Sequence, residues 1–360
     1  MDHNHGKTER GLVRPGGTGI DRRWFMCSSV AAGTVAAAPA WLWAGADHSA
    51  QAAGMTTIKA THGTGLCNLG IFLVRERGLA KADGVQVEFV NTPSNADITT
   101  IFGAGLVDVS LIPYTNFMTL YDKGVPVKIV SGGGVEGCVI CGQPHVKTQA
   151  DAKGKVLGTF QADTLEILPY EWLKKANMSF KDCDVRYFGT SPELAQAFIA
   201  GSVDLMCHIE PYATQALNAT KAKGTVMISN GTDVYHQGYT DCVLAARTGL
   251  INENRAALKA LIKGLFIAQK QSEADRVSCV KDTVGKYYKA SVEDILDAST
   301  KQPNVVDQRA ETQFMMDRSG SMKELGYVDK PMDKNAFDWT LLQEVMSENK
   351  SLYDSLKLKS

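Results

Sequence analysis

In two segments about a hundred residues apart, the spacing of apolar residues changes from that of a helix to the alternation of a strand. The first reads FGAGLVDVSLIPY over residues 102–114, and the second reads FIAGSVDLMCHIEPY over residues 198–212. Apolar residues at i, i+3 and i+4 share one face of a helix, and a glycine commonly ends a helix. The alternation that follows each glycine is typical of a short strand. Each segment is therefore predicted to be one helix–strand unit.

Both units carry signals for a helix start and end in the same dipeptide. Ser94 and Asp97 have the spacing of a capping box, and Ser191-Pro192-Glu193 offers a cap, a proline and an acid in the first turn. Both units end in Pro-Tyr, at residues 113–114 and 211–212. Because loops at the carboxyl ends of strands hold the ligand in α/β proteins, the repeat predicts two lobes that face one cleft. The alternative is a chance similarity between two common units.

Strands and helices alternate along most of the remaining chain, which becomes mostly helical after Asn252. Further strands are predicted at residues 57–61, 85–90, 125–130, 138–141, 156–159, 185–188, 226–229 and 239–247. This order predicts an α/β protein in which residues 55–137 and 247–360 form lobe 1 and residues 143–238 form lobe 2. The chain would cross between the lobes near residues 138–142 and 239–246, and two crossovers form a hinge.

Residues 1–52 are predicted to be an export signal. Asp21-Arg22-Arg23-Trp24-Phe25-Met26 precedes a mildly apolar stretch rich in Ala, Gly and Ser, and Ala50-Gln51-Ala52 offers a cleavage site. Paired arginines before a weakly apolar region resemble a twin-arginine signal. A membrane anchor is the alternative, but polar and small residues dilute the stretch below a typical spanning helix. We therefore expect a periplasmic protein that the twin-arginine translocase exports.

Composition and charge narrow the possible functions. The chain has 360 residues, 44% of them hydrophobic, and a formal net charge of −1, so nothing indicates nucleic-acid binding. Seven cysteines lie after residue 52 at irregular spacing, which does not predict a disulfide framework. The sequence contains no Gly-Lys-Ser/Thr phosphate loop, no Gly-x-Ser-x-Gly elbow and no His-Glu-x-x-His pair. No cofactor and no catalytic residue is predicted.

In their order, several short motifs resemble the periplasmic solute-binding proteins of ABC importers, in the nitrate, sulfonate, taurine and thiamine-pyrimidine-precursor class. The resemblance covers nearly the whole chain after the signal. The resemblance rests on residues Thr61–Gly78, Gly84–Phe89, Ala104–Asp108, Gly124–Val127, Asp151–Gly158, Ala200–Asp204 and Glu210–Tyr212. It implies a two-lobed type II binding-protein fold with two crossover strands, no catalysis and capture of a small solute in the cleft by lobe closure. It also implies an ABC permease as partner, and we expect a monomer.

The loops at the strand ends predict the ligand-binding residues. From lobe 1 these are His62, Thr64, Asn95, Tyr114 and Thr115; from lobe 2 and the hinge they are Phe160, Gln161, Asp163, Thr164, His208, Glu210, Tyr212, Tyr239 and Asp241. The loops contain no Lys or Arg, whereas aromatic rings and carboxylates are frequent. That pattern favours a neutral or nitrogen-heterocyclic solute, through stacking and hydrogen bonds, and leaves a sulfonate or nitrate-like anion open.

Some of these residues have a structural alternative. Asp163 could cap the helix that follows it, and Glu210 could hold backbone amides of its own loop. Tyr114 and Tyr212 could pack in the cores instead of facing the cleft.

Two functional alternatives also remain. The first is an enzyme or a sensor on the same two-lobed fold, although this chain lacks the dense cysteine cluster of a related group that makes thiamine pyrimidine. The second is a metal-binding variant, because thiols and a histidine lie near the expected cleft and hinge and could bind copper or zinc. These are Cys67, Cys138, Cys207, Cys242 and His208. Cys138 and Cys141 point to opposite faces of their strand, and no paired-ligand motif completes a zinc site, so no metal is predicted.

Overall fold

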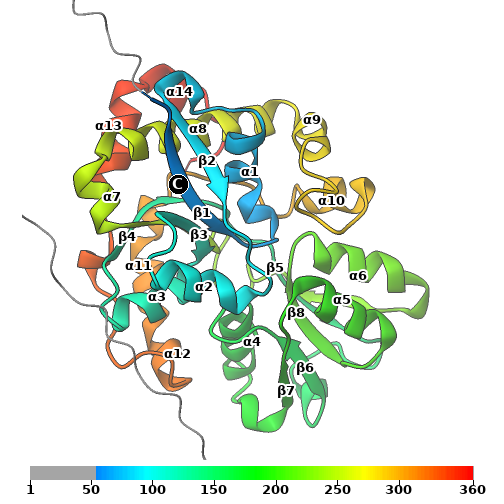
Figure 1. Cartoon of the computed structure of the whole chain (residues 1–360). Helices are drawn as coiled ribbons and strands as arrows, with labels where there is room; N and C mark the ends of the chain where they lie inside the picture. The colour runs from blue at the N-terminus through cyan, green and yellow to red at the C-terminus, as the bar shows by residue number, and fades with distance from the viewer. Residues whose placement is uncertain (1–53, 360) are drawn as a thin grey trace, which may run out of the picture. The chain divides into compact units, whose positions relative to one another are not determined.

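Two mixed five-stranded sheets organise the computed structural model, which describes residues 54–359. The first sheet has the strand order β2-β1-β3-β10-β4 (Figure 1). Its strands are β1 (Thr56–His62), β2 (Val85–Phe89), β3 (Val109–Pro113), β4 (Val127–Gly132) and β10 (Cys242–Arg247). β1 pairs in parallel with β2 and β3, whereas β10 lies antiparallel between β3 and β4.

The second sheet repeats this arrangement, in the order β7-β6-β8-β5-β9. Its strands are β5 (Cys138–Gly142), β6 (Val156–Thr159), β7 (Asp184–Tyr187), β8 (Leu205–Ile209) and β9 (Val226–Ser229). β6 pairs in parallel with β7 and β8, and β5 lies antiparallel between β8 and β9. In each sheet, therefore, the strand that the chain enters after crossing from the other sheet, β5 or β10, lies antiparallel in the fourth position.

The two repeated segments occupy equivalent positions in the two sheets. Helix α2 (Asn95–Gly103) leads into β3, and helix α5 (Ser191–Ala200) leads into β8. The Pro-Tyr that ends each segment starts the next helix, so that α3 (Tyr114–Asp122) and α6 (Tyr212–Thr220) begin at the two tyrosines. The predicted helix–strand units are confirmed.

The chain passes between the sheets in residues 133–137 and 230–241. Residues 138–142, which the sequence placed in the hinge, form β5 and pair with β8 and β9. Residues 242–247 form β10 of the first sheet. Residues 138–142 and 242–246 are non-polar and buried, as expected of strands that pair on both sides, and only Arg247 at the end of β10 is half-buried. The lobe boundaries given above remain a prediction.

The remaining helices cover the sheets, and some of those near the C-terminus contact elements around both sheets. They are α1 (Leu69–Glu76), α4 (Thr164–Lys174), α7 (Thr248–Glu253), α8 (Arg255–Ala274), α9 (Arg276–Lys281), α10 (Val292–Ala298), α11 (Thr312–Asp317), α12 (Ser319–Glu324), α13 (Thr340–Glu348) and α14 (Lys350–Asp354). α12 contacts α4, where Lys174 pairs with Glu324 at 2.6 Å, and α10 contacts α6. Residues assigned to lobe 1 thus also touch the second sheet's helices. Within residues 54–359, no helix combines the length and apolarity needed to cross a bilayer.

Apolar side chains on both faces of the first sheet and around the second sheet form the cores. On one face of the first sheet, Phe72 of α1 packs in a cluster with residues of α8, and on the other Phe102 and Phe117 come from α2 and α3. Phe198 of α5 belongs to the cluster around the second sheet. Burial of such a side chain contributes about 1.5–3 kcal/mol, so these contacts fix the sheets that present the strand ends. The predicted export signal and its cleavage site lie outside the described residues.

Gly134, in the first crossing segment, is predicted to tolerate no side chain. A Cβ at this position would lie 2.4 Å from Cys67 Cβ and 2.6 Å from Cys67 Cα. Gly134→Ala should therefore lower the free energy of unfolding by about 1–3 kcal/mol, measured by urea denaturation. Gly249→Ala is the control, since a Cβ there, in exposed helix α7, meets no atom within 4 Å. Equal stability of Gly134→Ala and the wild type would contradict this packing.

Candidate functional site

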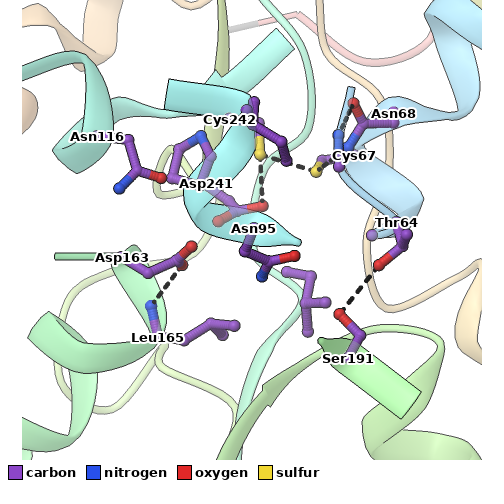
Figure 2. A pocket seen from close by; sticks show the side chains of 15 residues that line it. Thr64, Cys67, Asn68, Asn95, Asn116, Asp163, Leu165, Ser191, Asp241 and Cys242 are labelled. Carbon is purple, nitrogen blue, oxygen red and sulfur yellow. Dashed lines mark hydrogen bonds between the residues drawn. The ribbon is translucent and has the colours of Figure 1, made fainter. Parts of the chain in front are cut away.

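Three cavities adjoin one another between the first sheet and the second. The innermost has a volume of about 40 Å³. Its lining residues are Gly63, Thr64, Gly65, Cys67, Asn68, Asn95, Ile98, Pro113, Asn116, Asp163, Leu165, Ser191, Ile209, Asp241 and Cys242 (Figure 2). Cavities of about 610 and 480 Å³ flank it, and Asn95 lines all three. A volume of 40 Å³ has room for a few waters or a small solute.

Three helix N-termini converge on the innermost cavity. Asn95 begins α2, Ser191 begins α5, and Asp163 is the N-cap of α4. The first turn of a helix presents unpaired N–H groups and a partial positive charge. The helix ends therefore bring partial positive charge to the cavity from both halves of the molecule, which are built on the first and the second sheet. Of the described residues that line the cavity, none is Lys or Arg, and two are aspartates, Asp163 and Asp241.

The caps agree with the sequence at two of these helices and differ at the third. The capping box of α2 is formed, with the Ser94 N–H donating to Asp97 Oδ2 at 2.9 Å. Asp163 Oδ1 accepts from the Leu165 N–H at 3.1 Å, so Asp163 both caps α4 and lines the cavity. At α5 the N-cap residue is Thr190, not the predicted Ser191. The Ser191 hydroxyl instead accepts a hydrogen bond from the other half.

Direct hydrogen bonds join the two halves around the cavity. Thr64 Oγ1 donates to Ser191 Oγ at 2.9 Å, and the Leu66 N–H donates to the Glu210 carbonyl at 2.8 Å (Figure 2 shows the first). Across the cavity, Asn116 Nδ2 donates to the Ala162 carbonyl at 2.9 Å. These contacts hold the two halves together beside the cavity.

Asp241 is a buried carboxylate with uncharged partners. Its Oδ1 accepts from Thr164 Oγ1 at 2.6 Å, and its Oδ2 accepts from Gln302 Nε2 at 2.9 Å and from Cys242 Sγ at 3.1 Å. Burial raises the pKa of the Asp241 carboxyl above its ordinary value. Burial also raises the pKa of Asp163 to about 7, and the nearby Asp241 adds to this effect. The two carboxyl groups therefore take up protons more readily than exposed ones.

His208 and Glu210 have structural roles next to the cavity. His208 Nδ1 accepts from the Ile209 N–H at 2.8 Å, so Nε2 carries the proton that it donates to the Ser191 carbonyl, also at 2.8 Å. Burial lowers the pKa of His208 to about 4, so the ring is neutral. Glu210 accepts from the Thr214 N–H at 3.0 Å and from Thr214 Oγ1 at 2.9 Å, and burial raises its pKa to about 7. The alternative that Glu210 holds its own loop fits these contacts.

The structure brings eight of the fourteen predicted site residues to the cavities. Thr64, Asn95, Asp163 and Asp241 line the innermost one; His62 and Tyr212 line the 610 Å³ cavity; Phe160 and Gln161 line the 480 Å³ cavity. The lining of these three cavities does not include Tyr114, Thr115, Thr164, His208, Glu210 or Tyr239, all of them buried. Tyr114 belongs to a core cluster, where its ring centroid lies 5.8 Å from that of Phe314.

Several lining residues were not among the predicted site residues. Ser191 stands in the helix-start position of the second unit, where the repeat itself could have indicated it. Asn68 and Leu165 follow the expected turns by a few residues. Lysine and arginine side chains also line the flanking cavities: Arg75, Lys286 and Lys289 line the 610 Å³ cavity, and Lys123 lines the 480 Å³ cavity. None of them lies in the strand-end loops from which the site was predicted.

The family profile and the solved structures agree on the fold. Residues 55–279 match the profile of the NMT1-like family. The ligand-binding component of an ABC-type import system from Staphylococcus aureus, solved with zinc bound, is 17% identical; the match covers 81% of this chain and 99% of that one, with a TM-score of 0.69. No curated protein matches this chain in sequence.

Two periplasmic binding proteins show the same likeness. The aliphatic sulphonate-binding protein SsuA from Escherichia coli is 19% identical, over 79% of this chain and 92% of that one, with a TM-score of 0.65. The nitrate-binding protein NrtA from Synechocystis PCC 6803 is 16% identical, over 85% and 92%, with a TM-score of 0.69. DszB, an enzyme, also has this fold, at 12% identity and a TM-score of 0.60. The predicted type II binding-protein fold is confirmed.

The protonation of Glu210 predicts a pH-dependent stability. Because its pKa in the folded protein lies near 7, above the ordinary value of 4.5, the neutral form is favoured by folding. This stabilisation is complete below about pH 4.5 and is lost as the pH rises through 7. Glu210→Gln should therefore gain stability relative to the wild type between pH 5 and pH 8, by up to about 3 kcal/mol.

Urea unfolding of both proteins at several pH values measures this difference. Glu253→Gln, at an exposed glutamate of α7, is the control and should show no such trend. If the gap between Glu210→Gln and the wild type stays constant from pH 5 to pH 8, the carboxyl is ionised throughout.

Proposed function

The chain belongs to the NMT1-like family, and from this membership and the cavity that both halves line we propose that it is the solute-binding component of an ABC importer. It would capture a small organic solute by lobe closure and deliver it to a permease. Export to the periplasm by the twin-arginine route, action as a monomer and the absence of catalysis are parts of the same proposal.

The observation that carries the proposal is that both halves line one cavity and bond to each other around it. A solute in this cavity would touch Thr64 and Asn95 from the first half and Asp163 and Ser191 from the second. Such a solute has its full contacts only when the halves are together, so its binding shifts the balance toward the closed state. A permease can distinguish loaded from empty protein by that change.

The chemistry of the innermost cavity favours a neutral or nitrogen-heterocyclic solute. Amide groups of Asn68, Asn95 and Asn116 can donate and accept, while Asp163 and Asp241 can accept from N–H groups. Both carboxyl groups are buried without a charged hydrogen-bond partner in the described part of the chain, which suits a solute that carries donors.

A sulfonate or nitrate-like anion is the alternative solute. The helix N-termini of α2, α4 and α5 favour an anion, and Arg75, Lys286 and Lys289 on the 610 Å³ cavity would attract one. We favour the first class because these cations lie outside the innermost cavity, where the carboxyl groups are.

A binding role also agrees better with the thiols than a covalent enzyme does. Cys67 lines the cavity, but burial raises the pKa of its thiol to about 12. Since the thiolate is the reactive form, this group is a poor nucleophile at neutral pH. An enzyme on this fold would need another attacking group.

The proposal predicts stabilisation without turnover. In a thermal-shift screen of small solutes, one chemical class should raise the melting temperature, and a solute at a hundred times its Kd adds about 2.7 kcal/mol of stability. Native mass spectrometry should show one solute per chain, and chromatography should recover that solute unchanged. Conversion of the solute by the purified protein would contradict the proposal.

Gly65→Ala should weaken solute binding by hindering closure. A Cβ on Gly65 would lie 2.7 Å from Cγ1 of Ile209 in the other half, whereas the Gly65 backbone, at φ −73°, accepts an alanine. An overpacking cost of about 1–3 kcal/mol corresponds to about 5- to 150-fold in Kd. Isothermal titration calorimetry with the solute found in the screen measures this loss.

Gly249→Ala is again the matched control and should bind normally. The double variant Gly65→Ala/Ile209→Ala should recover much of the affinity, because it removes the opposing Cγ1. Normal affinity of Gly65→Ala would mean that binding does not require the observed contact between the halves.

A further inference from the structure

We propose that Cys67, Cys242 and Asp241 form a binding site for one thiophilic metal ion, of the Zn²⁺ or Cu⁺ class, at the floor of the innermost cavity. This goes beyond solute transport. Cys242 begins β10, Asp241 precedes it at the end of the second crossing segment, and Cys67 lies in the short 3-10 helix between β1 and α1.

The three donor atoms converge from distant parts of the chain. Cys67 Sγ and Cys242 Sγ lie 2.8 Å apart although 175 positions separate them, and Cys242 Sγ lies 3.1 Å from Asp241 Oδ2. Figure 2 shows the two sulfur atoms and the carboxylate side by side. All three ligand atoms lie within 4.8 Å of one another, and all three residues are buried. A single ion can reach all of them at once.

The charge around these donors favours a cation. The Asp241 carboxylate accepts hydrogen bonds from the side chains of Thr164, Cys138, Cys242 and Gln302, none of them positively charged. Asp163 adds a second buried carboxyl group on the cavity wall. A buried carboxylate is normally paired or coordinates a metal, and among residues 54–359 no cationic side chain hydrogen-bonds to Asp163 or Asp241.

The donor set also indicates which ions fit. Two sulfur ligands select Zn²⁺ or Cu⁺ over Mg²⁺ and Ca²⁺, which prefer oxygen. With Zn–S bonds of about 2.3 Å and tetrahedral angles, the two sulfur atoms would sit about 3.8 Å apart, so they must separate by about 1 Å. Both side chains line the cavity, which gives them that room. Three protein ligands leave a position open to the cavity for water or a small solute.

An outer partner already orients one of the ligands. Asn68 Nδ2 donates to Cys67 Sγ at 3.2 Å, and Asn68 Oδ1 accepts from the Gly63 N–H at 3.2 Å. Such outer contacts fix the orientation of a ligand. In contrast, Cys138, Cys141, Cys207 and Cys279 are buried but line none of the three cavities, although Cys138 Sγ donates to Asp241 Oδ1 at 3.5 Å. The Cys67–Cys242 pair thus differs from the other buried thiols of the described residues in its access to the cavity.

Metal titration of the reduced, metal-free full chain tests the site. Zn²⁺ and, under anaerobic conditions, Cu⁺ are the probes in separate arms, Cd²⁺ reports thiolate bonding through its ultraviolet charge-transfer band, and Mg²⁺ is the hard-ion control. We expect one equivalent of a thiophilic ion per chain, with affinity that rises with pH because two thiol protons leave on binding. Mg²⁺ should not bind at this site. No saturable binding of Zn²⁺ or Cu⁺ would overturn the proposal.

Single substitutions locate the ion. Cys67→Ser and Cys242→Ser should each weaken Zn²⁺ binding by more than about 100-fold, and Asp241→Asn by about 10- to 100-fold. Cys183→Ser is the control within the described residues, since Cys183 is half-buried and donates to the Ala152 carbonyl. Cys27→Ser is the control for the cysteine that lies outside the described residues. Unchanged affinity in both Cys67→Ser and Cys242→Ser would overturn the proposal.

Alkylation of the wild-type protein gives an independent test in case a variant fails to fold. Zn²⁺ should protect Cys67 and Cys242 from iodoacetamide under mildly destabilising conditions, as peptide mapping by mass spectrometry would show. Protection confined to other cysteines would overturn the proposal. So would a Cys67–Cys242 disulfide that forms on exposure to oxidised glutathione equally fast with and without saturating Zn²⁺.

Discussion

The direct contact between the two halves around one small cavity is the constraint on which the candidate site depends. Thr64 and Ser191 share a hydrogen bond across it, the Leu66 N–H reaches the Glu210 carbonyl, and Thr164 donates to Asp241. None of these pairs belongs to a single sheet. The cavity exists because the carboxyl ends of β1 and β3 meet those of β6 and β8, where the two sheets turn the same edge toward each other.

Burial in this contact decides the chemistry of the site. It excludes Lys and Arg from the innermost lining while keeping two carboxyl groups, several amides and three helix N-termini. Desolvation raises the pKa of Asp163 and Asp241, and it lowers that of His208, so the groups around the cavity tend toward their neutral forms. Such a site discriminates by hydrogen-bond donors and acceptors more than by net charge. The same lack of cations is what makes the thiol–carboxylate cluster attractive to a metal ion.

The sequence predicts the architecture well because helix caps, glycines and the spacing of apolar residues determine its helices and strands locally. The repeated helix–strand unit, its glycines and its capping box at Ser94 reappear as α2–β3 and α5–β8. Four of the predicted residues reach the innermost cavity because the strand-end rule locates loops correctly. That rule cannot tell which way a side chain points: Tyr114 and Tyr212 occupy equivalent positions and both are buried in cores, but of the two only Tyr212 also lines one of the three cavities. Contacts between distant segments, such as Cys67 with Cys242 or Arg75 near the cleft, need the folded chain.

Hydrogen–deuterium exchange with and without a bound solute tests most directly whether both halves hold it. If the solute lies in the cavity, it should slow exchange of backbone amides at Gly63–Leu66 in the first half and at Thr164–Glu166 and Ser191–Leu194 in the second, together and with the same dependence on solute concentration. Protection restricted to one half, with unchanged exchange in the other, would show that the solute does not join them and would contradict the account.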